Sequence, residues 1–391
     1  MKYNFDNSSD RLNTYATKWQ ILEDNNLENQ VVPMWIADMD FDVCKEVIDE
    51  IKNRLEKPIF GYTNVQDGLY DAFCNWYNRR LNYAIAKETI LLTTSVMTTY
   101  KAIINLYSNV NDKVIIPYPN YHRFKEYVNL NGRIPLYTEM KLVSGRYKID
   151  FYDLESKIDE NTKIFILCNP SNPLGFVFNQ EELLEIANFC QKHNLIIFND
   201  EIHLDFILGN TSFTPFALIN DYTRNNTIST LSISKTFNLA GMKISAAVVI
   251  NDDKRKEIKD YINKVGLGSI NTFAYLAMEI AYLKGEDWFE QVLEYLKNNR
   301  KYAYEFIEAK MPHICTYKTE ATYFLWLDLS ITNLKNQELE ETLLKEAKVM
   351  PSMGVEFGEG YDSYVRLNLA TKFDNIVTVF NELEKFLKKY G

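Results

Sequence analysis

Short apolar runs alternate with longer amphipathic segments between about residues 88 and 250. The runs are TILLTT, KVIIP, KIFILCNP, LIIFNDE, TISTLSISK and ISAAVVI, and one of the segments between them is QEELLEIANFCQKHN. Continuous rather than alternating apolar residues indicate strands that are covered on both faces. The pattern therefore predicts an α/β fold, in which a mostly parallel sheet lies between helices and binds ligands at the carboxyl ends of its strands.

After Ser269 the pattern changes to long helices with a few strands between them. NTFAYLAMEIAYLKG and WFEQVLEYLKNNRKYAYEFIEAK have the helical period, whereas ATYFLWLDL and SYVRLNLA are typical of strands. The first 45 or so residues contain no clear strand and helix unit, so we expect them to pack on this second part. The predicted large domain is residues 48–277, and the predicted smaller α+β domain combines residues 1–47 and 278–391.

Composition adds several exclusions to this picture. No apolar run approaches the roughly 20 residues that cross a bilayer, so we expect no membrane association. The N-terminal MKYNFDNSSDRLNTYATKWQ lacks the apolar core of a signal peptide, which predicts a cytoplasmic protein. A net charge of -10 argues against nucleic-acid binding and favours a small-molecule ligand. The five cysteines and four histidines show no paired spacing, so neither disulfides nor a bound metal is expected.

Polar residues follow three of the predicted strands, in CNPSNPLG (168–175), NDEIHLD (199–205) and SISK (232–235). Each has an ordinary explanation, because Asn-Pro pairs form turns, a strand-terminal aspartate caps helices, and a lysine usually extends its amine to water. A lysine amine that is buried instead is costly, or its pKa falls, unless it finds a partner. The three segments are therefore informative only in combination.

In this order and at about these separations, the three segments resemble the aminotransferase class I/II superfamily of pyridoxal phosphate (PLP) enzymes, fold type I. The resemblance covers nearly the whole chain. It implies that Lys235 forms a Schiff base with the cofactor aldehyde and later moves the substrate Cα proton. It also implies that Asp200 pairs with the pyridinium nitrogen and that Asn172 hydrogen-bonds the phenolic oxygen. The Asn172-Pro173 peptide is expected to be cis, an isomer of only about 5% of X-Pro bonds.

The same resemblance implies a phosphate site at the start of a helix. TTSVMTTYKAI runs from a strand into a helical pattern, which brings the backbone amides of Val96 and Met97 to a helix N-terminus. Ser232 and Ser234 resemble the hydroxyl donors that the family places beside its lysine.

Two residues of this predicted phosphate site depart from the family pattern. Lys243 stands where the family has a phosphate-binding arginine, so the charge is kept but the bidentate fork is lost. Ser95 stands where the related lyases commonly have glycine. Both are still expected among the cofactor-binding residues, in an arrangement that the resemblance does not determine.

The resemblance also assigns roles to aromatic residues. Tyr118 in IPYPNYHRF resembles the aromatic residue that stacks on the cofactor ring, and Tyr121 is the second candidate. Tyr62 in FGYTNVQDGLYDAF resembles the tyrosine that reaches the phosphate from the neighbouring subunit. The active unit is therefore expected to be a homodimer.

Four further segments resemble one group within the superfamily. VVPMWIADMDF (31–41), DEIHLDF (200–206), SKTFNLAGM (234–242) and EATYFLWLDL (320–329) are similar to the cystathionine β-lyase type of carbon-sulfur lyase, the MalY/PatB group. His203 lies where aminotransferases typically have a tyrosine that touches the phenolic oxygen, so we expect it beside the cofactor.

The substrate site is expected to include Arg366, whose guanidinium in YVRLNLA would bind the substrate carboxylate. Trp35, Ala37, Asn172 and Tyr323 are expected to line the same site. For Trp35, core packing is an equal alternative.

These resemblances predict α,β-elimination from cystathionine or another cysteine S-conjugate, with pyruvate, ammonia and a thiol as products. An aminotransferase acting on an aromatic or neutral amino acid is the alternative, because both reactions share the same carbanion. A regulatory protein with the same fold, which acts by binding a transcription factor, is a further alternative.

Overall fold

An eight-stranded sheet forms the centre of the fold, with the strand order β2-β9-β8-β7-β6-β3-β4-β5. The structure is a computed structural model that describes residues 2–391, so Met1, the first residue of the predicted small domain, lies outside the described part. The strands are β2 (Ile90–Thr93), β3 (Lys113–Tyr118), β4 (Ile134–Val143), β5 (Arg146–Ile149), β6 (Thr162–Cys168), β7 (Ile196–Asp200), β8 (Thr227–Leu231) and β9 (Ser245–Val248).

Most strands of this sheet run in the same direction. β8, β7, β6, β3 and β4 pair in parallel, one after another. β9 is antiparallel to both of its neighbours, and β5 is antiparallel to β4 at the sheet edge. The predicted α/β class with a mostly parallel sheet is confirmed.

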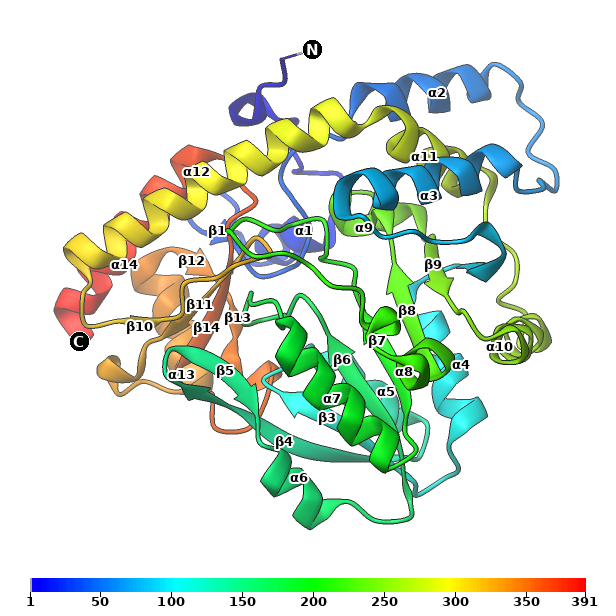
Figure 1. Cartoon of the computed structure of the whole chain (residues 1–391). Helices are drawn as coiled ribbons and strands as arrows, with labels where there is room; N and C mark the ends of the chain where they lie inside the picture. Colours follow the sequence, from blue (N-terminus) through cyan, green and yellow to red (C-terminus); the bar gives the residue numbers. More distant parts are fainter. Residues whose placement is uncertain (1) are drawn as a thin grey trace.

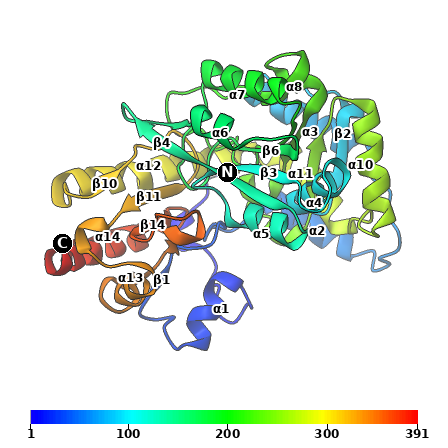
Figure 2. The same cartoon turned by 90° about the horizontal axis from the view of Figure 1, so that it is seen from below.

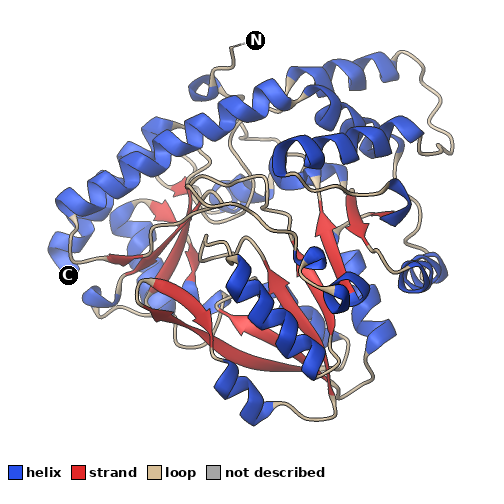
Figure 3. Ribbon diagram, viewed as in Figure 1, coloured by secondary structure: helices blue, strands red, loops and turns tan. Residues whose placement is uncertain are grey.

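Strand β6 shows why its apolar run is continuous. Ile164 and Ile166 belong to the core between the sheet and helices α4, α5 and α10, whereas Phe165 and Leu167 belong to the core beneath α7. Successive side chains of a strand point to opposite faces, so both faces of the sheet are covered. Figure 3 shows the red strands between the blue helices.

The helices that surround the large sheet are named in chain order in Figure 1. They are α2 (Lys45–Leu55), α3 (Asp67–Leu81), α4 (Val96–Tyr107), α5 (His122–Leu130), α6 (Phe151–Lys157), α7 (Gln180–Lys192), α8 (Asp221–Asn226), α9 (Ile233–Thr236), α10 (Asp252–Lys264) and α11 (Thr272–Lys284). No helix among residues 2–391 is long and apolar enough to span a membrane.

A second, antiparallel sheet has four strands in the order β10-β11-β14-β13. Its strands are β10 (Cys315–Thr316), β11 (Phe324–Asp328), β13 (Ser352–Met353) and β14 (Tyr364–Asn368), and its helices are α12 (Glu286–Lys310), α13 (Asn336–Thr342) and α14 (Phe373–Tyr390). This sheet and its helices form the C-terminal unit.

The N-terminal segment joins this C-terminal unit through a short parallel pair. β1 (Val32–Pro33) pairs with β12 (Val349–Met350). Helix α1 (Thr17–Asp24) lies beside β1, as Figure 2 shows. Helix α12 contributes side chains to the core of each unit, Trp288 to one and Ile307 to the other. The domain boundaries at residues 48 and 277 stay a prediction.

Candidate active site

Three of the predicted site residues meet at the carboxyl ends of β6, β7 and β8. Asn172 follows β6, Asp200 is the last residue of β7, and Lys235 lies in α9 directly after β8. Parallel strands end at one edge of the sheet, so residues far apart in the sequence converge there. Together with the start of α4 they line a cavity of about 230 Å³.

The amine of Lys235 is held inside this cavity. Its Nζ donates a hydrogen bond of 2.5 Å to the carbonyl oxygen of Ala37. Burial lowers the pKa of Lys235 to about 8, and the neighbouring Arg366 and Lys243 act in the same direction, against the charges of Asp38 and Asp200. A lysine with this pKa is partly uncharged near neutral pH and is able to act as a nucleophile or a base.

The carboxylate of Asp200 faces the same cavity and is only 4% exposed. It accepts hydrogen bonds from the backbone amide of Ile202 (3.2 Å) and the hydroxyl of Thr230 (3.4 Å), and no ion pair within residues 2–391 includes it. Burial raises the pKa of Asp200 to about 6. The charge of Lys235 offsets this increase only in part, so the buried carboxylate is a fitting partner for a positively charged ligand nitrogen.

His203 and Asn172 line the cavity on either side of Asp200 in the sequence. His203 is 2% exposed, and burial holds its pKa well below the usual value, so the ring is neutral. Its Nδ1 has no hydrogen-bond partner within the described chain. The Asn172-Pro173 peptide is cis, as predicted, and the Asn172 side chain accepts a hydrogen bond of 2.8 Å from Arg366.

The start of α4 supplies backbone donors at one end of the cavity. Ser95 caps the helix, since its hydroxyl accepts a hydrogen bond of 3.1 Å from the amide of Thr98. Val96 and Met97 are the first two helical residues, whose amides have no partner inside a helix. Both residues line the cavity, so a phosphate placed here meets a helix N-terminus.

Hydroxyl groups and a lysine complete this end of the cavity. Ser232 and Ser234 line it, and the Ser232 hydroxyl accepts a hydrogen bond of 3.0 Å from the amide of Ser234. Lys243 lines it as well, with a left-handed backbone conformation (φ 57°). The structure therefore brings all the predicted phosphate-binding residues of this chain together, Tyr62 excepted.

Arg366 is buried beside the cavity on β14. Its guanidinium donates hydrogen bonds to Asn172 (2.8 Å), Ser352 (3.1 Å) and the carbonyl oxygen of Trp35. Burial lowers the pKa of Arg366 to about 10, so the group stays charged at neutral pH. Within residues 2–391 the hydrogen bonds of Arg366 go to neutral acceptors, and the Glu356 charge that raises its pKa does not outweigh burial, so the guanidinium has charge available for an anionic ligand.

Of the other predicted substrate residues, Ala37 and Trp35 contribute backbone carbonyl groups, whereas Tyr323 contributes its side chain. Ala37 lines the cavity, and the hydroxyl of buried Tyr323 donates to its carbonyl oxygen at 3.3 Å. Trp35 contributes its carbonyl oxygen to Arg366, whereas its indole N–H donates to the carbonyl of Lys18 at 3.2 Å. The indole of Trp35 thus packs against α1, in line with the packing alternative.

The structure places Tyr121, and not Tyr118, at the cavity. Tyr118 packs instead against Gly358, where a Cβ atom would come within 2.6 Å of the tyrosine ring. Because residue 358 has no side chain, there is room for the Tyr118 ring beside it, away from the cavity. Tyr62 lies in an exposed loop, 110% exposed, and does not reach the cavity of its own chain.

Several residues near the site were missed by the sequence analysis. Asp38 supplies a negative charge near Lys235, Thr94 lines the cavity, and Ser352 holds Arg366. Asn368 donates hydrogen bonds of 2.7 Å to the carbonyls of Ile36 and Asp38. The sequence does contain a clue to Asn368. Side chains two residues apart on a strand share one face, so Asn368 lies on the same face as Arg366.

Three parts of the cavity match three groups of one ligand. A lysine amine with a lowered pKa suits a carbonyl carbon, an uncompensated buried carboxylate suits a cationic ring nitrogen, and a helix N-terminus with hydroxyls and Lys243 suits a phosphate. PLP carries all three groups. The residues present therefore fit that cofactor.

Comparisons with known proteins point to the same cofactor. The chain is 35% identical to cystathionine beta-lyase PatB of Bacillus subtilis, over 95% of this chain and 98% of that protein, and 28% identical to protein MalY of Escherichia coli, over 94% of each. Among solved structures, a PLP-bound putative aminotransferase from Clostridium difficile has a TM-score of 0.94 at 36% identity, covering 99% of this chain and all of that one. Cystalysin from Treponema denticola, with a PLP cofactor, has a TM-score of 0.94 at 30% identity and full coverage of both chains. Residues 29–380 match the family model of aminotransferase class I and II. The chain therefore belongs to the aminotransferase class I and II family.

Proposed function

We propose that this chain is a PLP-dependent carbon-sulfur lyase, which converts a cysteine thioether and water into a thiol, pyruvate and ammonia. One observation carries the proposal. The Lys235 amine, with its pKa lowered to about 8, and the uncompensated Asp200 carboxylate line one cavity, in a chain 35% identical to a cystathionine beta-lyase over 95% of its length. A solved C-S lyase from Staphylococcus hominis, with a TM-score of 0.90 at 30% identity, supports the same reaction class.

Different residues of the chain have different roles in this reaction. When bound, PLP supplies an electron-accepting ring that stabilises negative charge at the substrate Cα. Arg366 binds the substrate carboxylate, and Lys235 accepts the Cα proton through its uncharged amine. With the cofactor bound, Asp200 would keep the ring nitrogen positively charged. The electrons of the broken Cα–H bond form a Cα=Cβ double bond while those of the Cβ–S bond leave with sulfur, which takes up a proton to give the thiol, and water then releases pyruvate and ammonia.

The test is to incubate the PLP-loaded protein with L-cystathionine and to measure pyruvate and free thiol. Equal amounts of both products, formed without any added keto acid, are expected. Lys235→Ala should abolish both, whereas Lys297→Ala, at an exposed lysine of α12, should not. Retention of full activity by Lys235→Ala would contradict the proposal.

An aminotransferase is the second candidate, favoured by the similarity to the putative aminotransferase from Clostridium difficile. This reaction requires an amino acceptor, and it leaves sulfur on the carbon skeleton. Keto acid that forms only when an acceptor is supplied, with no free thiol, would decide for the aminotransferase. The regulatory role stays a prediction.

We also propose a homodimer in which Tyr62 reaches the neighbouring site. Apolar side chains on its loop are uncovered, with Ile59 83%, Phe60 53% and Tyr62 110% exposed. Exposed apolar patches of this kind mark protein interfaces. Light scattering should give twice the chain mass of 45.8 kDa, and Tyr62→Ala should weaken PLP binding without changing the fold. A monomer with full PLP affinity would contradict the proposal.

A cytoplasmic location belongs to the same proposal. The cysteines whose side chains the structure describes, Cys44, Cys74, Cys168 and Cys190, are all unpaired. Free thiols are typical of reducing compartments. Cell fractionation of the native host should recover the protein with the cytoplasmic fraction.

A further inference from the structure

Two phenylalanine rings pack against the guanidinium of Arg366. The ring centre of Phe324, on β11, lies 4.2 Å from the guanidinium carbon, and that of Phe357, in the segment after β13, lies 4.9 Å from it. Phe324 is 1% exposed and Phe357 is 4% exposed, so both contacts are shielded from water. The negative face of an aromatic ring attracts a cation, and this attraction is strongest where both groups are desolvated.

The two rings lie where a buried arginine commonly has a carboxylate partner. No ion pair within residues 2–391 includes Arg366, and its Nε is buried without a hydrogen-bond partner in this part of the chain. The Glu356 carboxylate raises the pKa of Arg366 but forms no ion pair with it. A paired carboxylate would neutralise the guanidinium, whereas aromatic rings stabilise its charge and leave that charge available to a ligand.

The backbone of Phe357 is fixed by hydrogen bonds on both sides of its ring. Its amide donates a hydrogen bond of 2.9 Å to the carbonyl oxygen of Gly354, and its carbonyl oxygen accepts one of 2.9 Å from the amide of Asn120, before α5. The Phe357 ring also packs edge to face with Trp326, at 5.5 Å between ring centres. Trp326 is in turn the direct neighbour of Arg366 across β11 and β14. Both units of the fold therefore determine where the Phe357 ring lies.

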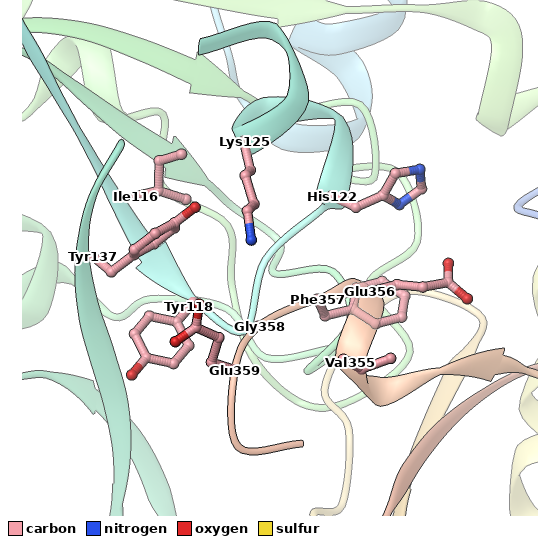
Figure 4. Close-up of a pocket in the computed structure, with 10 residues that line it drawn as sticks. All are labelled: Ile116, Tyr118, His122, Lys125, Tyr137, Val355, Glu356, Phe357, Gly358 and Glu359. Carbon is pink, nitrogen blue, oxygen red and sulfur yellow. The ribbon is translucent and has the colours of Figure 1, made fainter. Parts of the chain in front are cut away.

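Phe357 borders a second cavity, of about 70 Å³, as well as Arg366. Figure 4 shows this cavity, with Lys125 of α5 extending into it and Tyr118 and Tyr137 on one side. A cavity of this size holds several waters, since each needs roughly 10–15 Å³. A smaller side chain at residue 357 would extend the cavity toward the guanidinium, where water would compete with a bound carboxylate.

We propose that Phe324 and Phe357 are positioning residues for the substrate carboxylate, a role that rests on the carboxylate binding proposed for Arg366. Their rings hold the guanidinium in a fixed orientation while it stays charged, and they act through Arg366 rather than on the reacting atoms. Leucine at either position keeps an apolar side chain but has no negative ring face, so it would not restrain the guanidinium in the same way. The loss should therefore appear in the binding of carboxylates and not in the chemical step.

The test compares L-alanine with ethylamine, which is the same amine without the carboxylate. Spectral titration of the PLP-loaded protein gives a Kd for each, and the ratio of the ethylamine Kd to the L-alanine Kd measures the contribution of the carboxylate. In Phe357→Leu and in Phe324→Leu this ratio should fall about tenfold, whereas Phe357→Tyr, which keeps a ring, should stay within about threefold of the original. Phe386→Leu, at a residue 2% exposed in the core of the C-terminal unit, is the matched control and should keep the ratio within about twofold.

Turnover gives an independent measurement of the same effect. In Phe357→Leu, the KM for L-cystathionine should rise about tenfold while kcat stays within about threefold, because the rings affect binding. A general loss of structure would instead lower kcat as well. The two leucine changes lie in different segments, so either one tests the role of the rings if the other variant does not fold.

The outcomes distinguish the role of the rings from that of Arg366. If Arg366→Ala lowers the ratio for the two amines but both leucine variants keep it, the positioning role is overturned and the role of Arg366 stands. If Arg366→Ala keeps the ratio, both roles are overturned. An equal fall in Phe386→Leu would show a general effect of core packing and would also overturn the positioning role. If the protein does not cleave L-cystathionine, the lyase function fails, and the ratio for the two amines still decides the role of the rings.

Discussion

Lys235 shows how burial changes the chemistry of a single residue. With a pKa of about 8, its uncharged fraction rises about tenfold between pH 7 and pH 9, whereas an ordinary lysine would gain about a hundredfold. The rate at which the PLP-free protein attaches PLP covalently should follow that fraction and level off near pH 9. Borohydride trapping and mass spectrometry would measure the rate, and a hundredfold rise without a plateau would contradict the lowered pKa.

Ionisation of the buried Asp200 lowers the stability of the folded, PLP-free protein. Its pKa is about 6 in the folded chain and about 3.9 when unfolded, so the folded state holds more protons between these values. The stability of the PLP-free protein should therefore fall as pH rises from about 4 to about 6, by roughly 3 kcal/mol as an order of magnitude.

Asp200→Asn should remove this cost. Above pH 7 the variant is expected to raise the free energy of unfolding of the PLP-free protein by about 1–3 kcal/mol and to weaken PLP binding. Urea denaturation at pH 8 and pH 4 would test it, because the gain should nearly vanish at pH 4, where both proteins carry a neutral group. An equal gain at both pH values would point to a different cause.

At the scale of elements, the segment from Trp35 to Asp40 contacts both Lys235 and Arg366. The carbonyl oxygen of Ala37 accepts a hydrogen bond from Lys235, and that of Trp35 accepts one from Arg366. Asp40 at its end is 6% exposed and lies 2.8 Å from the Nζ of Lys18 in α1 and 3.0 Å from Arg11. Burial by itself raises the pKa of Asp40, but the charges of Lys18 and Arg11 outweigh it and lower the pKa. The contribution of Asp40 to stability is therefore present above about pH 4 and is lost as pH falls through the lowered pKa.

Lys18→Met should destabilise the protein by about 2–4 kcal/mol, because it leaves Arg11 as the one ion-pair partner of the buried Asp40 carboxylate among the described residues. The double variant Lys18→Met/Asp40→Asn should lose less than the sum of the two single changes. Chemical denaturation at pH 7 gives the free energies of unfolding, and additive losses would show that Lys18 and Asp40 do not interact.

At the scale of the whole molecule, α12 links the two cores. Its first half packs with the core around α3 and α11, and its second half packs with the core of the C-terminal unit. Leu296→Ala, at a residue 1% exposed, should cost about 2–4 kcal/mol and speed hydrogen exchange in β7 and β14 together. Lys297→Ala, on the exposed side of the same helix, is the control. Faster exchange in one sheet only would show that the two units open independently.

Most of the candidate site follows from the order of residues along the chain. Asn172, Asp200 and Lys235 each follow a predicted buried strand, and parallel strands must end at one edge, so their meeting follows from the pattern once the topology is assumed. The sequence also predicts that the N-terminal segment packs on the C-terminal part, and this division stays a prediction, because β1 pairs with β12 whereas Phe5 and Phe41 belong to the core around α3 and α11.

The sequence by itself thus determined the sheet, its ligand-binding edge and the residues at the strand ends, because these features depend on local periodicity and on short motifs. Only the tertiary structure decided that Tyr121 rather than Tyr118 lines the cavity, that Lys18 meets Asp40, and that Lys125 faces the segment of Phe357 across a second cavity. Each of these depends on a contact between residues far apart in the chain. A local sequence pattern does not show how much space a distant residue such as Gly358 leaves for its neighbours.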